Sequence, residues 1–562
     1  MVRNPTALVP VAILPYSAVM LNKATINDLI TILKKDCKRA MQLKVSGFPR
    51  LYYCFFLLRD VEWFNTWAGS GSTFRRRSDH TRNVYCDLRV GSYHFDQTTD
   101  GGLFDNDEEV DSHQYVKLPI DDKCYDGLRI ALWKLSETKF REALTDYSNK
   151  RAADISTVNP NRKLNSFLKT KPHHFIRYKR RDHIEEDKWV RFCKNASKWL
   201  SELTRLSGNW VEFDVIQESK IFVNTEGSVI VQHLKTFSLI VTIRRLTPEG
   251  SHIEQELVYN CASQDELPNM RQFKKDALTK FMQLEKISRS KKIHSFSGPV
   301  LLYPTPAGLL FHEAIGHRLE GNRLLYSGEG QTFKGQTGKK IFNVDITIRD
   351  NPKLKSFRGR KCVGSYDFDD EGTPARDTLL VENGILRDFL NTRAACCKKN
   401  FQPNGHARNK NHQRPISRMA VMIVKGKEVY PTERLREMLV EEIKKQGKPF
   451  GMIVYETSGG ETETTSYDFQ AFFGEISYAT LVYPDGRETP IRGVDFIGTP
   501  LQALNNIIAV GDTPELDNGY CGAESGMVPV STISPAVLIS DLELQTKEEE
   551  LVTQYILPSP RL

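Results

Sequence analysis

Two histidines and a glutamate within six residues are the part of this sequence best suited to chemistry. The segment reads His312-Glu313-Ala314-Ile315-Gly316-His317. Neutral imidazole is the commonest protein ligand for Zn²⁺, and a carboxylate beside the metal can remove a proton from water. The residue types therefore indicate a metal site of the kind found in hydrolases.

The spacing of the two histidines does not fit an ideal helix. Histidines four residues apart, as in the familiar zinc-protease helix, lie about 40° apart around the axis, whereas a separation of five residues gives roughly 140°. Side chains so far apart do not share one face. We expect the helix either to unwind at Gly316 or to carry a π-bulge, whose i→i+5 hydrogen bond would bring His312 and His317 into line. In both cases the distortion centres on Gly316.

Flanking residues predict the ends of this helix. Thr305 can cap its N-terminus, Pro306 suits the first helical position, and Gly321 can end it in a left-handed conformation. The alternative is an ordinary core helix with two incidental histidines. We favour a metal, because it would satisfy polar side chains that an apolar helix otherwise buries without partners.

A zinc site needs a third protein ligand, and the residues leave two candidates open. Glu320 lies three residues after His317 and is within helical reach of the same metal, but it could equally orient an imidazole from behind. Cys521 is the softer ligand, and Zn²⁺ would keep its thiol ionised. Taken alone, Cys521 could also be a small buried hydrophobe. The chemistry of these residues does not choose between the two.

Three further motifs accompany the histidine segment. They are Asp-Asp-Glu-Gly-Thr-Pro at 369–374, the Asn404-Gly405 pair, and Asp-Asn-Gly-Tyr-Cys-Gly at 517–522. In order and spacing, the four motifs resemble the TldD/PmbA family of metallopeptidases over most of residues 295–540. PmbA-type members of that family lack the metal motif and act as partners of the active TldD-type subunit. This chain keeps every motif and so resembles the active type.

The resemblance implies roles for individual residues. His312, His317 and Cys521 would hold Zn²⁺ and leave a fourth position for water, and Glu313 would take the proton of that water and pass it to the departing amine. The implied substrate is an unfolded or small peptide, which could pair with a strand edge. Subunits of the family pair around an enclosed active site, which implies a homodimer or a heterodimer with a PmbA-type relative.

Length and composition bound the architecture. A chain of 562 residues with 40% hydrophobic content can bury sizeable cores and should hold two or three domains. The pattern of the chain changes near residues 290–298. We expect an α+β fold with a mixed N-terminal domain over residues 1–294. A β-rich C-terminal domain over residues 295–562, largely antiparallel and barrel-like, would carry the histidine helix.

Hydrophobic periodicity predicts individual elements. Helices are expected at 25–43, 125–150 and 432–446, with another ending near residue 286, and strands at 83–90, 219–223 and 239–244. Asn383-Gly384 and Asp485-Gly486 predict type I′ hairpin turns. Thr432 should cap the helix that follows it, and Gly447 should end that helix.

Charge and cysteine usage bear on partners and compartment. The net charge is +8, and residues 162–198 hold twelve Lys/Arg against four Asp/Glu with aromatic residues interleaved. Such a mixture can mark nucleic-acid contact, but acidic residues 185–187 interrupt it, and a solvated helical surface is the simpler interpretation. The ten cysteines show no framework spacing, which favours a reducing, cytoplasmic compartment. Pro10 and Pro15 break the apolar segment 7–21, and no stretch reaches the ~18 apolar residues of a membrane span.

Three functions from different classes remain on these grounds. The first is a zinc metallopeptidase, and the second is a catalytically silent peptide-binding partner with a structural metal, in which Glu313 would have no role. The third is a nucleic-acid-associated factor using residues 162–198. Segments 404–414 and 457–465 could line a peptide cleft or be plain surface loops. We favour the peptidase, because three protein ligands with an open fourth position are typical of catalytic zinc.

Overall fold

The computed structural model describes most of the chain. The described residues are 21–98, 115–121, 124–156, 164–178, 182–204, 206–247, 249–325, 331–394, 402–410, 414–464 and 471–547. The loop at 100–111 and all of the apolar segment 7–21 except Leu21 lie outside these ranges. Within them, no helix is long and apolar enough to cross a membrane.

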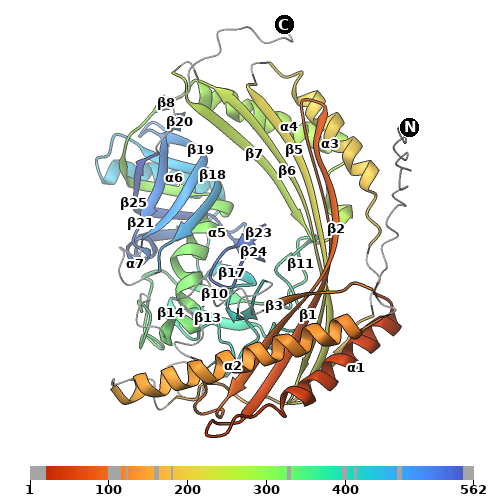
Figure 1. The fold of residues 1–562 in the computed structure, drawn as a ribbon. Helices are drawn as coiled ribbons and strands as arrows, with labels where there is room; N and C mark the ends of the chain where they lie inside the picture. Colours follow the sequence, from red (N-terminus) through yellow and green to blue (C-terminus); the bar gives the residue numbers. More distant parts are fainter. Residues whose placement is uncertain are drawn as a thin grey trace, which may run out of the picture.

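The N-terminal part is built on one long, curved sheet (Figure 1). Its strands are β1 (Leu51–Gly69), β2 (Ser72–Val90), β3 (Tyr115–Leu118), β4 (His174–Ile176), β5 (Gly208–Asn224), β6 (Val229–Leu246) and β7 (His252–Cys261). The order is β3-β2-β1-β5-β6-β4, with β7 also on β6, and only the β4–β6 pair is parallel. The three predicted strands are confirmed, but each is part of a longer one. Residues 72–79 of β2 are mostly exposed and arginine-rich, so hydrophobic alternation could not indicate them.

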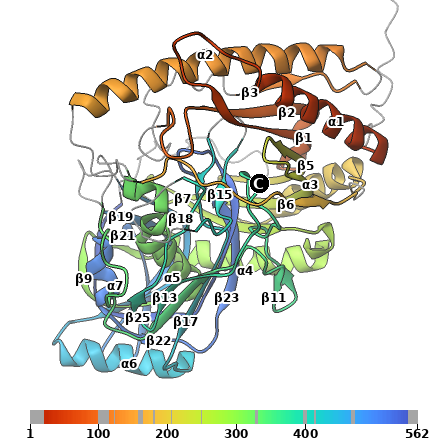
Figure 2. The same cartoon turned by 90° about the horizontal axis from the view of Figure 1, so that it is seen from below.

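Four helices cover this sheet in two pairs (Figure 2). They are α1 (Lys23–Ala40), α2 (Asp126–Ser156), α3 (Glu186–Leu200) and α4 (Met270–Ser288). The predicted helices at 25–43, at 125–150 and ending near residue 286 are confirmed. The first pair shares a core with β1 and β2, and the second pair shares one with β5 and β6. Leu128, Leu132 and Leu135 recur at helical spacing and are buried on the inner face of α2.

The last part of the basic stretch 162–198 forms most of α3, which begins at Glu186. Its Trp189 is buried and stacks on Phe213 with ring centroids 4.2 Å apart. Arg76 pairs with Glu186 and Asp187 at the start of the helix. This aromatic residue therefore serves the core and cannot stack on nucleic-acid bases.

The C-terminal part contains a closed five-stranded barrel. Its strands are β9 (Phe296–Leu302), β18 (Gly451–Thr462), β19 (Phe472–Val482), β21 (Val494–Gly498) and β25 (Val537–Thr546). Because β18 pairs with both β9 and β19, the order β18-β9-β25-β21-β19 closes on itself. Four of these pairings are antiparallel and β9–β18 is parallel. The fold is α+β with a β-rich, barrel-containing C-terminal part, as the sequence predicts.

Shorter elements surround the barrel. Three strands extend its sheet, namely β8 (Lys291–Lys292), β20 (Glu488–Arg492) and β22 (Ile507–Val510), and two helices, α6 (Thr432–Lys445) and α7 (Pro500–Asn505), pack nearby. Two small hairpins, β11 (Ser356–Phe357) with β12 (Arg360–Lys361) and β15 (Ala407–Arg408) with β16 (Ile416–Ser417), lie in the connections. Residues 457–462 belong to β18, so the loop expected at 457–465 is strand over most of its length.

A second sheet lies beside the barrel. Its strands are β10 (Ile346–Asp350), β13 (Thr378–Glu382), β14 (Ile385–Leu386), β17 (Val421–Gly426), β23 (Glu515–Cys521) and β24 (Val528–Ser534). They follow the order β14-β13-β10-β17-β24-β23, which puts β23 at an edge. Helix α5 (Pro304–Phe311) contacts β18 of the barrel as well as β23 and β24. The histidine segment is therefore held between the two sheets.

The predicted turns and caps are partly confirmed. Asn383 (φ 47°) and Gly384 (φ 79°) have the two positive φ angles of a type I′ turn. At the second hairpin only Gly486 has a positive φ, so the hairpin forms with a different turn. Gly447 (φ 62°) follows the end of α6 as expected, but Thr432 is already the first helical residue and the preceding proline offers no side-chain cap.

Buried ion pairs connect the N-terminal sheet to the C-terminal part. Arg59 on β1 lies 2.7 Å from Glu218 on β5 and 3.2 Å from Asp370 of the 369–374 motif. Lys220 Nζ is 2.7 Å from the other oxygen of Asp370. This acidic motif therefore joins the two parts of the molecule.

Candidate metal centre

The helix that carries the histidines is distorted where the spacing requires it. Residues 304–311 are α-helical, residues 312–316 form a π-helical turn, and residues 317–319 form a 3₁₀ turn. The π turn adds one residue to the usual repeat, which brings His312 and His317 to the same side. The distortion predicted around Gly316 is therefore present.

The expected ends of this helix are wrong in detail. The helix begins at Pro304 after Tyr303, with no side-chain cap, so Thr305 is inside the first turn and not before it. Gly321 does not have a left-handed backbone. A Cβ at Gly321 would lie 2.7 Å from Asn391 Oδ1 and 2.8 Å from the Leu390 carbonyl oxygen, so close packing explains the glycine. Spacing alone does not distinguish a glycine needed for its φ angle from one needed for its size.

Gly316 is also a packing requirement. A Cβ at this position would lie 2.0 Å from Met419 Sδ and 2.8 Å from Met422 Cε. The missing side chain lets the segment before β17 approach the π turn. The same glycine thus permits both the turn and the contact behind it.

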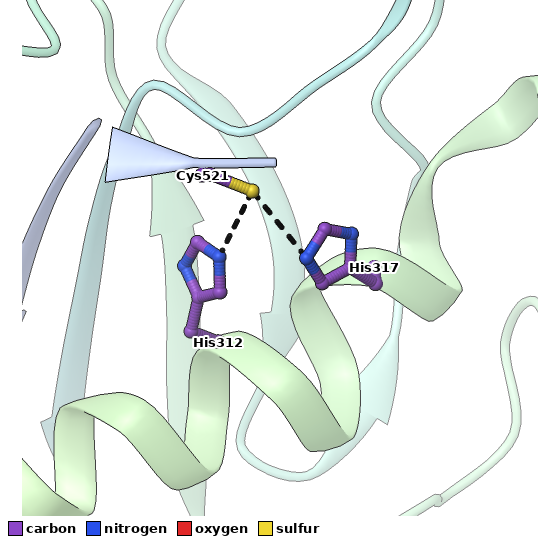
Figure 3. A group of neighbouring side chains, drawn as sticks. All are labelled: His312, His317 and Cys521. Atoms are coloured by element: carbon purple, nitrogen blue, oxygen red, sulfur yellow. Dashed lines mark hydrogen bonds between the residues drawn. The ribbon is translucent and has the colours of Figure 1, made fainter. Parts of the chain in front are cut away.

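Three donor atoms from distant parts of the chain meet at one point (Figure 3). His312 Nε2 lies 3.2 Å and His317 Nε2 lies 3.4 Å from Cys521 Sγ, which comes from the last residue of β23. The two imidazole planes are 85° apart, with centroids 5.1 Å from each other. Among the described residues, these three form the group of His, Cys, Asp and Glu side chains close enough to share a metal ion.

The geometry of the three donors fits a tetrahedral zinc ion. Zn–S and Zn–N bonds of about 2.3 and 2.0–2.1 Å at a tetrahedral angle place sulfur and nitrogen roughly 3.5 Å apart. The observed separations of 3.2 and 3.4 Å are close to that value. Two imidazoles and a thiolate also form a donor set that suits zinc.

The electrostatics of the three residues favour a bound cation. Burial alone would raise the pKa of the Cys521 thiol, but His317, His312 and a nearby guanidinium hold it well below its usual value. Burial would lower the pKa of His317, yet the Cys521 sulfur raises it well above its usual value, and the pKa of His312 is raised by the same neighbour. These shifts favour the thiolate form of Cys521, and a metal ion can replace the protons of the two imidazoles.

Glu320 lies behind the site and not in it. Its Oε1 is 3.2 Å from Nδ1 of His317, whose Nε2 faces the sulfur, while Oε2 accepts a hydrogen bond of 2.7 Å from Arg323. Burial opposes its ionisation, but Arg323 and His317 lower its pKa to about 2. An ionised carboxylate in this position fixes the orientation of the imidazole. The geometry therefore favours the orienting role over ligation.

Glu313, the predicted base, is buried beside the donor atoms. Its Oε2 lies 3.8 Å from His317 Nε2, the nitrogen that faces the sulfur. The backbone carbonyl of Glu313 accepts a hydrogen bond from Arg318, which also reaches Thr462 on β18. The carboxylate is thus next to the metal position without belonging to the donor set.

Arg418 is a site residue that sequence reasoning missed. Its Nη2 donates to the Cys521 carbonyl at 2.6 Å and to Cys521 Sγ at 3.1 Å, and its Nε lies 3.7 Å from Glu320 Oε1. Arg418 thus connects the thiolate to the carboxylate behind His317. No motif surrounds this arginine in the sequence, so only its place in the fold reveals it.

The C-terminal part matches known metallopeptidases. Residues 295–546 match the family model described as PmbA/TldA metallopeptidase C-terminal domain. A metalloprotease from Methanothermobacter thermautotrophicus is 32% identical over 237 residues, which cover 42% of this chain and 47% of the relative. A metalloprotease TldD homolog from Buchnera aphidicola (Acyrthosiphon pisum) is 30% identical over 260 residues, covering 45% and 49%. A zinc metalloprotease TldD homolog from Saccharolobus solfataricus is 24% identical, covering 44% and 51%.

Solved structures resemble the chain over nearly its whole length. A putative modulator of a DNA gyrase from Thermotoga maritima has a TM-score of 0.59 at 16% identity and covers 93% of this chain and 99% of its own. TldE from Thermococcus kodakarensis has a TM-score of 0.57 at 12% identity, with coverage of 93% and 100%. At these identities the likeness concerns the fold, including that of the N-terminal sheet.

The sequence matches place residues 295–546 in a class of metallopeptidase domains. Within that class, this part of the chain belongs to the TldD/PmbA family. The matched part spans about half the length of the curated relatives, 47% and 49% for the first two.

Proposed function

We propose that the protein is a zinc metallopeptidase in which His312, His317 and Cys521 hold the metal and Glu313 is the general base. The observation that carries the proposal is the convergence of two Nε2 atoms on Cys521 Sγ at 3.2 and 3.4 Å, across more than two hundred residues of sequence. The name of the Saccharolobus relative, a zinc metalloprotease, supports the choice of metal.

Each side chain of the site would have its own role in hydrolysis. Zinc bound here would supply Lewis acidity toward the peptide carbonyl and toward water. Glu313, held by the backbone of the π turn, would take a proton from the attacking water and return it to the departing amine. Glu320 would keep the His317 ring oriented, and Arg418 would hold the sulfur.

The proposed substrates are unfolded or small peptides. Strand β23, which carries Cys521, is the last strand of its sheet in the described part of the chain, and side chains of Arg360 and Asn260 already bond to its Leu516 and Asn518 carbonyls. A strand at a sheet edge can bind an extended peptide through main-chain hydrogen bonds with little sequence preference. We further propose assembly as a homodimer or with a PmbA-type relative, in keeping with the fold likeness to TldE. A reducing, cytoplasmic compartment agrees with the eight unpaired cysteines among the described residues.

The substitution Glu313→Gln tests the proposal. We expect the variant to keep its zinc, measured by metal analysis, and to lose cleavage of a peptide library by about 10²–10⁴-fold, the usual contribution of a general base. Glu428→Gln, on an exposed loop residue, is the matched control and should retain both properties.

Two other results would contradict parts of this assignment. Unchanged cleavage by the Glu313 variant would remove that residue from the mechanism. A zinc-loaded, unaltered protein that binds peptides of the library and cleaves none would instead identify a catalytically silent partner with a structural metal. The mass of the protein in solution, measured alone and with a PmbA-type relative, shows whether it forms a homodimer or a heterodimer.

A further inference from the structure

A small pocket lies between the N-terminal sheet and the strand that carries Cys521. It is walled by β1, β5 and β6 on one side and by residues 408–410, Tyr520 and residues 527–529 on the other. Its cavity volume is about 40 Å³. One water needs roughly 10–15 Å³ by this measure, so the pocket has room for a group of about three heavy atoms.

The lining of this pocket is mainly cationic. Five of its residues carry positive side chains, Arg59, Lys220, Lys235, Arg408 and Lys410, against two carboxylates, Glu218 and Asp370. The first two cations pair with those carboxylates, and Lys235 pairs with Asp182 outside the pocket. Ion pairs within the fold therefore account for three of the five cationic side chains.

Arg408 and Lys410 are the remaining two. Among the described residues, neither has a carboxylate oxygen within 4.0 Å; Arg408 donates instead to the carbonyls of Met419 and Pro529, both at 2.7 Å. Arg408 is 5% exposed, so its charge is held away from water. Burial lowers the pKa of Arg408 although Tyr366 and Asp370 oppose the shift, and Lys410 acts on Glu218 from beyond ion-pair distance. An arriving anion would therefore reduce a cost that these groups only partly offset.

The pocket is one residue away from the metal centre along β23. Tyr520 lines the pocket and donates to Thr236, and Cys521 is the next residue on the strand. Successive side chains of a strand point to opposite faces. A peptide paired with β23 next to Tyr520 and Cys521 would direct alternate side chains to the same two faces, one toward the histidines and the next toward the pocket.

We propose that this pocket is a substrate subsite that binds a peptide carboxylate through Arg408 and Lys410. The carboxylate has three heavy atoms and one negative charge, which matches the size of the pocket and its excess of cations over carboxylates. It could belong to a glutamate or aspartate side chain or to the C-terminus of the peptide. The ligand class rests on the proposed peptidase function, whereas binding of the anion can be measured without any cleavage.

Binding of labelled peptides to the zinc-loaded Glu313→Gln protein tests the subsite. One pair of fluorescent peptides differs by Glu against Gln at a single internal position, and a second pair has a free or an amidated C-terminus. We expect the charged member of at least one pair to bind about tenfold more tightly, as for a charge-assisted hydrogen bond. The pair that responds identifies the source of the carboxylate.

Two further variants, made in the Glu313→Gln background, decide the role of the pocket. Lys410→Gln, at a partly exposed residue, should abolish the preference for charge, and Lys425→Gln, at an exposed residue of β17 outside the pocket, should preserve it. Equal binding of both members in both pairs, or a preference that survives Lys410→Gln, would overturn the subsite.

Cleavage by the unaltered protein separates the two proposals. If it cleaves charged and neutral peptides alike and the binding preference is absent, the peptidase function stands without the subsite. If it cleaves none but the Lys410-dependent preference is present, the subsite stands and the peptidase function fails.

Discussion

Among single residues, Arg418 has the most direct effect on the Cys521 sulfur. It is fully buried and donates to both the carbonyl and the sulfur of the same cysteine. A thiolate gives a metal more negative charge than an imidazole does, and an N–H donor on the sulfur withdraws part of it. Hydrogen bonds of this kind tune the electronic properties of metal sites.

Replacing Arg418 with Gln should therefore change the metal site itself. In protein loaded with Co²⁺ in place of zinc, we expect the sulfur-to-metal absorption band to move to longer wavelength, because the sulfur electrons are held less tightly. Arg349→Gln, which alters an exposed pair with Asp377, should leave the band unchanged. If the Arg418 variant folds, binds cobalt and shows the original band, the hydrogen bond to sulfur has no electronic effect.

The π-helical turn is the decisive feature at the scale of elements. An undistorted helix would separate the two histidines by roughly 140°, and the extra residue of the turn removes that separation. The turn depends on Gly316, because the space that a side chain would need is filled by Met419. The geometry of the π turn and the packing of Met419 behind it thus both require glycine at position 316.

Gly316→Ala should destabilise the protein by about 1–3 kcal/mol, the usual cost of overpacking a core, and weaken zinc binding. Chemical denaturation and metal titration measure the two effects. Gly459→Ala on β18 is the control, since a Cβ there meets no atom within 4 Å. Combining Gly316→Ala with Met419→Ala should recover part of the zinc affinity. If the double variant binds zinc no better than the single one, the clash with Met419 is not the cause.

At the scale of the whole molecule, a network of buried ion pairs around Asp370, here called the ionic seam, connects the N-terminal sheet to the C-terminal part. Asp370 accepts hydrogen bonds from Lys220 and from the backbone N–H of Asn409. Arg59 forms ion pairs with both Asp370 and Glu218. The division of the chain into domains at 1–294 and 295–562 remains a prediction, and this seam is where the two would meet. The same seam forms one wall of the cationic pocket.

Acid should weaken this seam. Burial would raise the pKa of Asp370, but Lys220 and Arg59 lower it below its usual value, and Arg59 and Lys220 likewise lower the pKa of Glu218 against burial. Groups with a depressed folded-state pKa stabilise the protein above their unfolded value, about pH 4, and that stability is lost as the pH falls through the folded pKa. Asp370→Asn should therefore reduce the slope of stability against pH below about pH 4.

The same substitution should cost about 3–5 kcal/mol at neutral pH, because it leaves two buried cations without this partner. Denaturant unfolding of Asp370→Asn, of Lys220→Met and of the double variant provides the measurement. Removing the lysine as well should return part of the stability. Full additivity of the two losses would show that Asp370 and Lys220 do not interact.

Local chemistry was sufficient to predict some features of this protein. The His312–His317 spacing required a distorted helix because each α-helical residue turns the chain by about 100°, and Asn383-Gly384 required a hairpin because few residues accept two positive φ angles. Such constraints act within a few residues of sequence. They led to the π turn, the hairpin and most helices.

Tertiary structure alone decided the rest, because contacts between distant segments leave no local pattern. Residue chemistry favoured the softer Cys521 but left Glu320 open as the third ligand, and only the fold puts the sulfur beside both imidazoles and the carboxylate behind one of them. The places of Arg418, Arg408 and Lys410 depend in the same way on strands far apart in sequence. Side-chain roles that require an enclosed, low-dielectric setting appear only when the chain has folded around them.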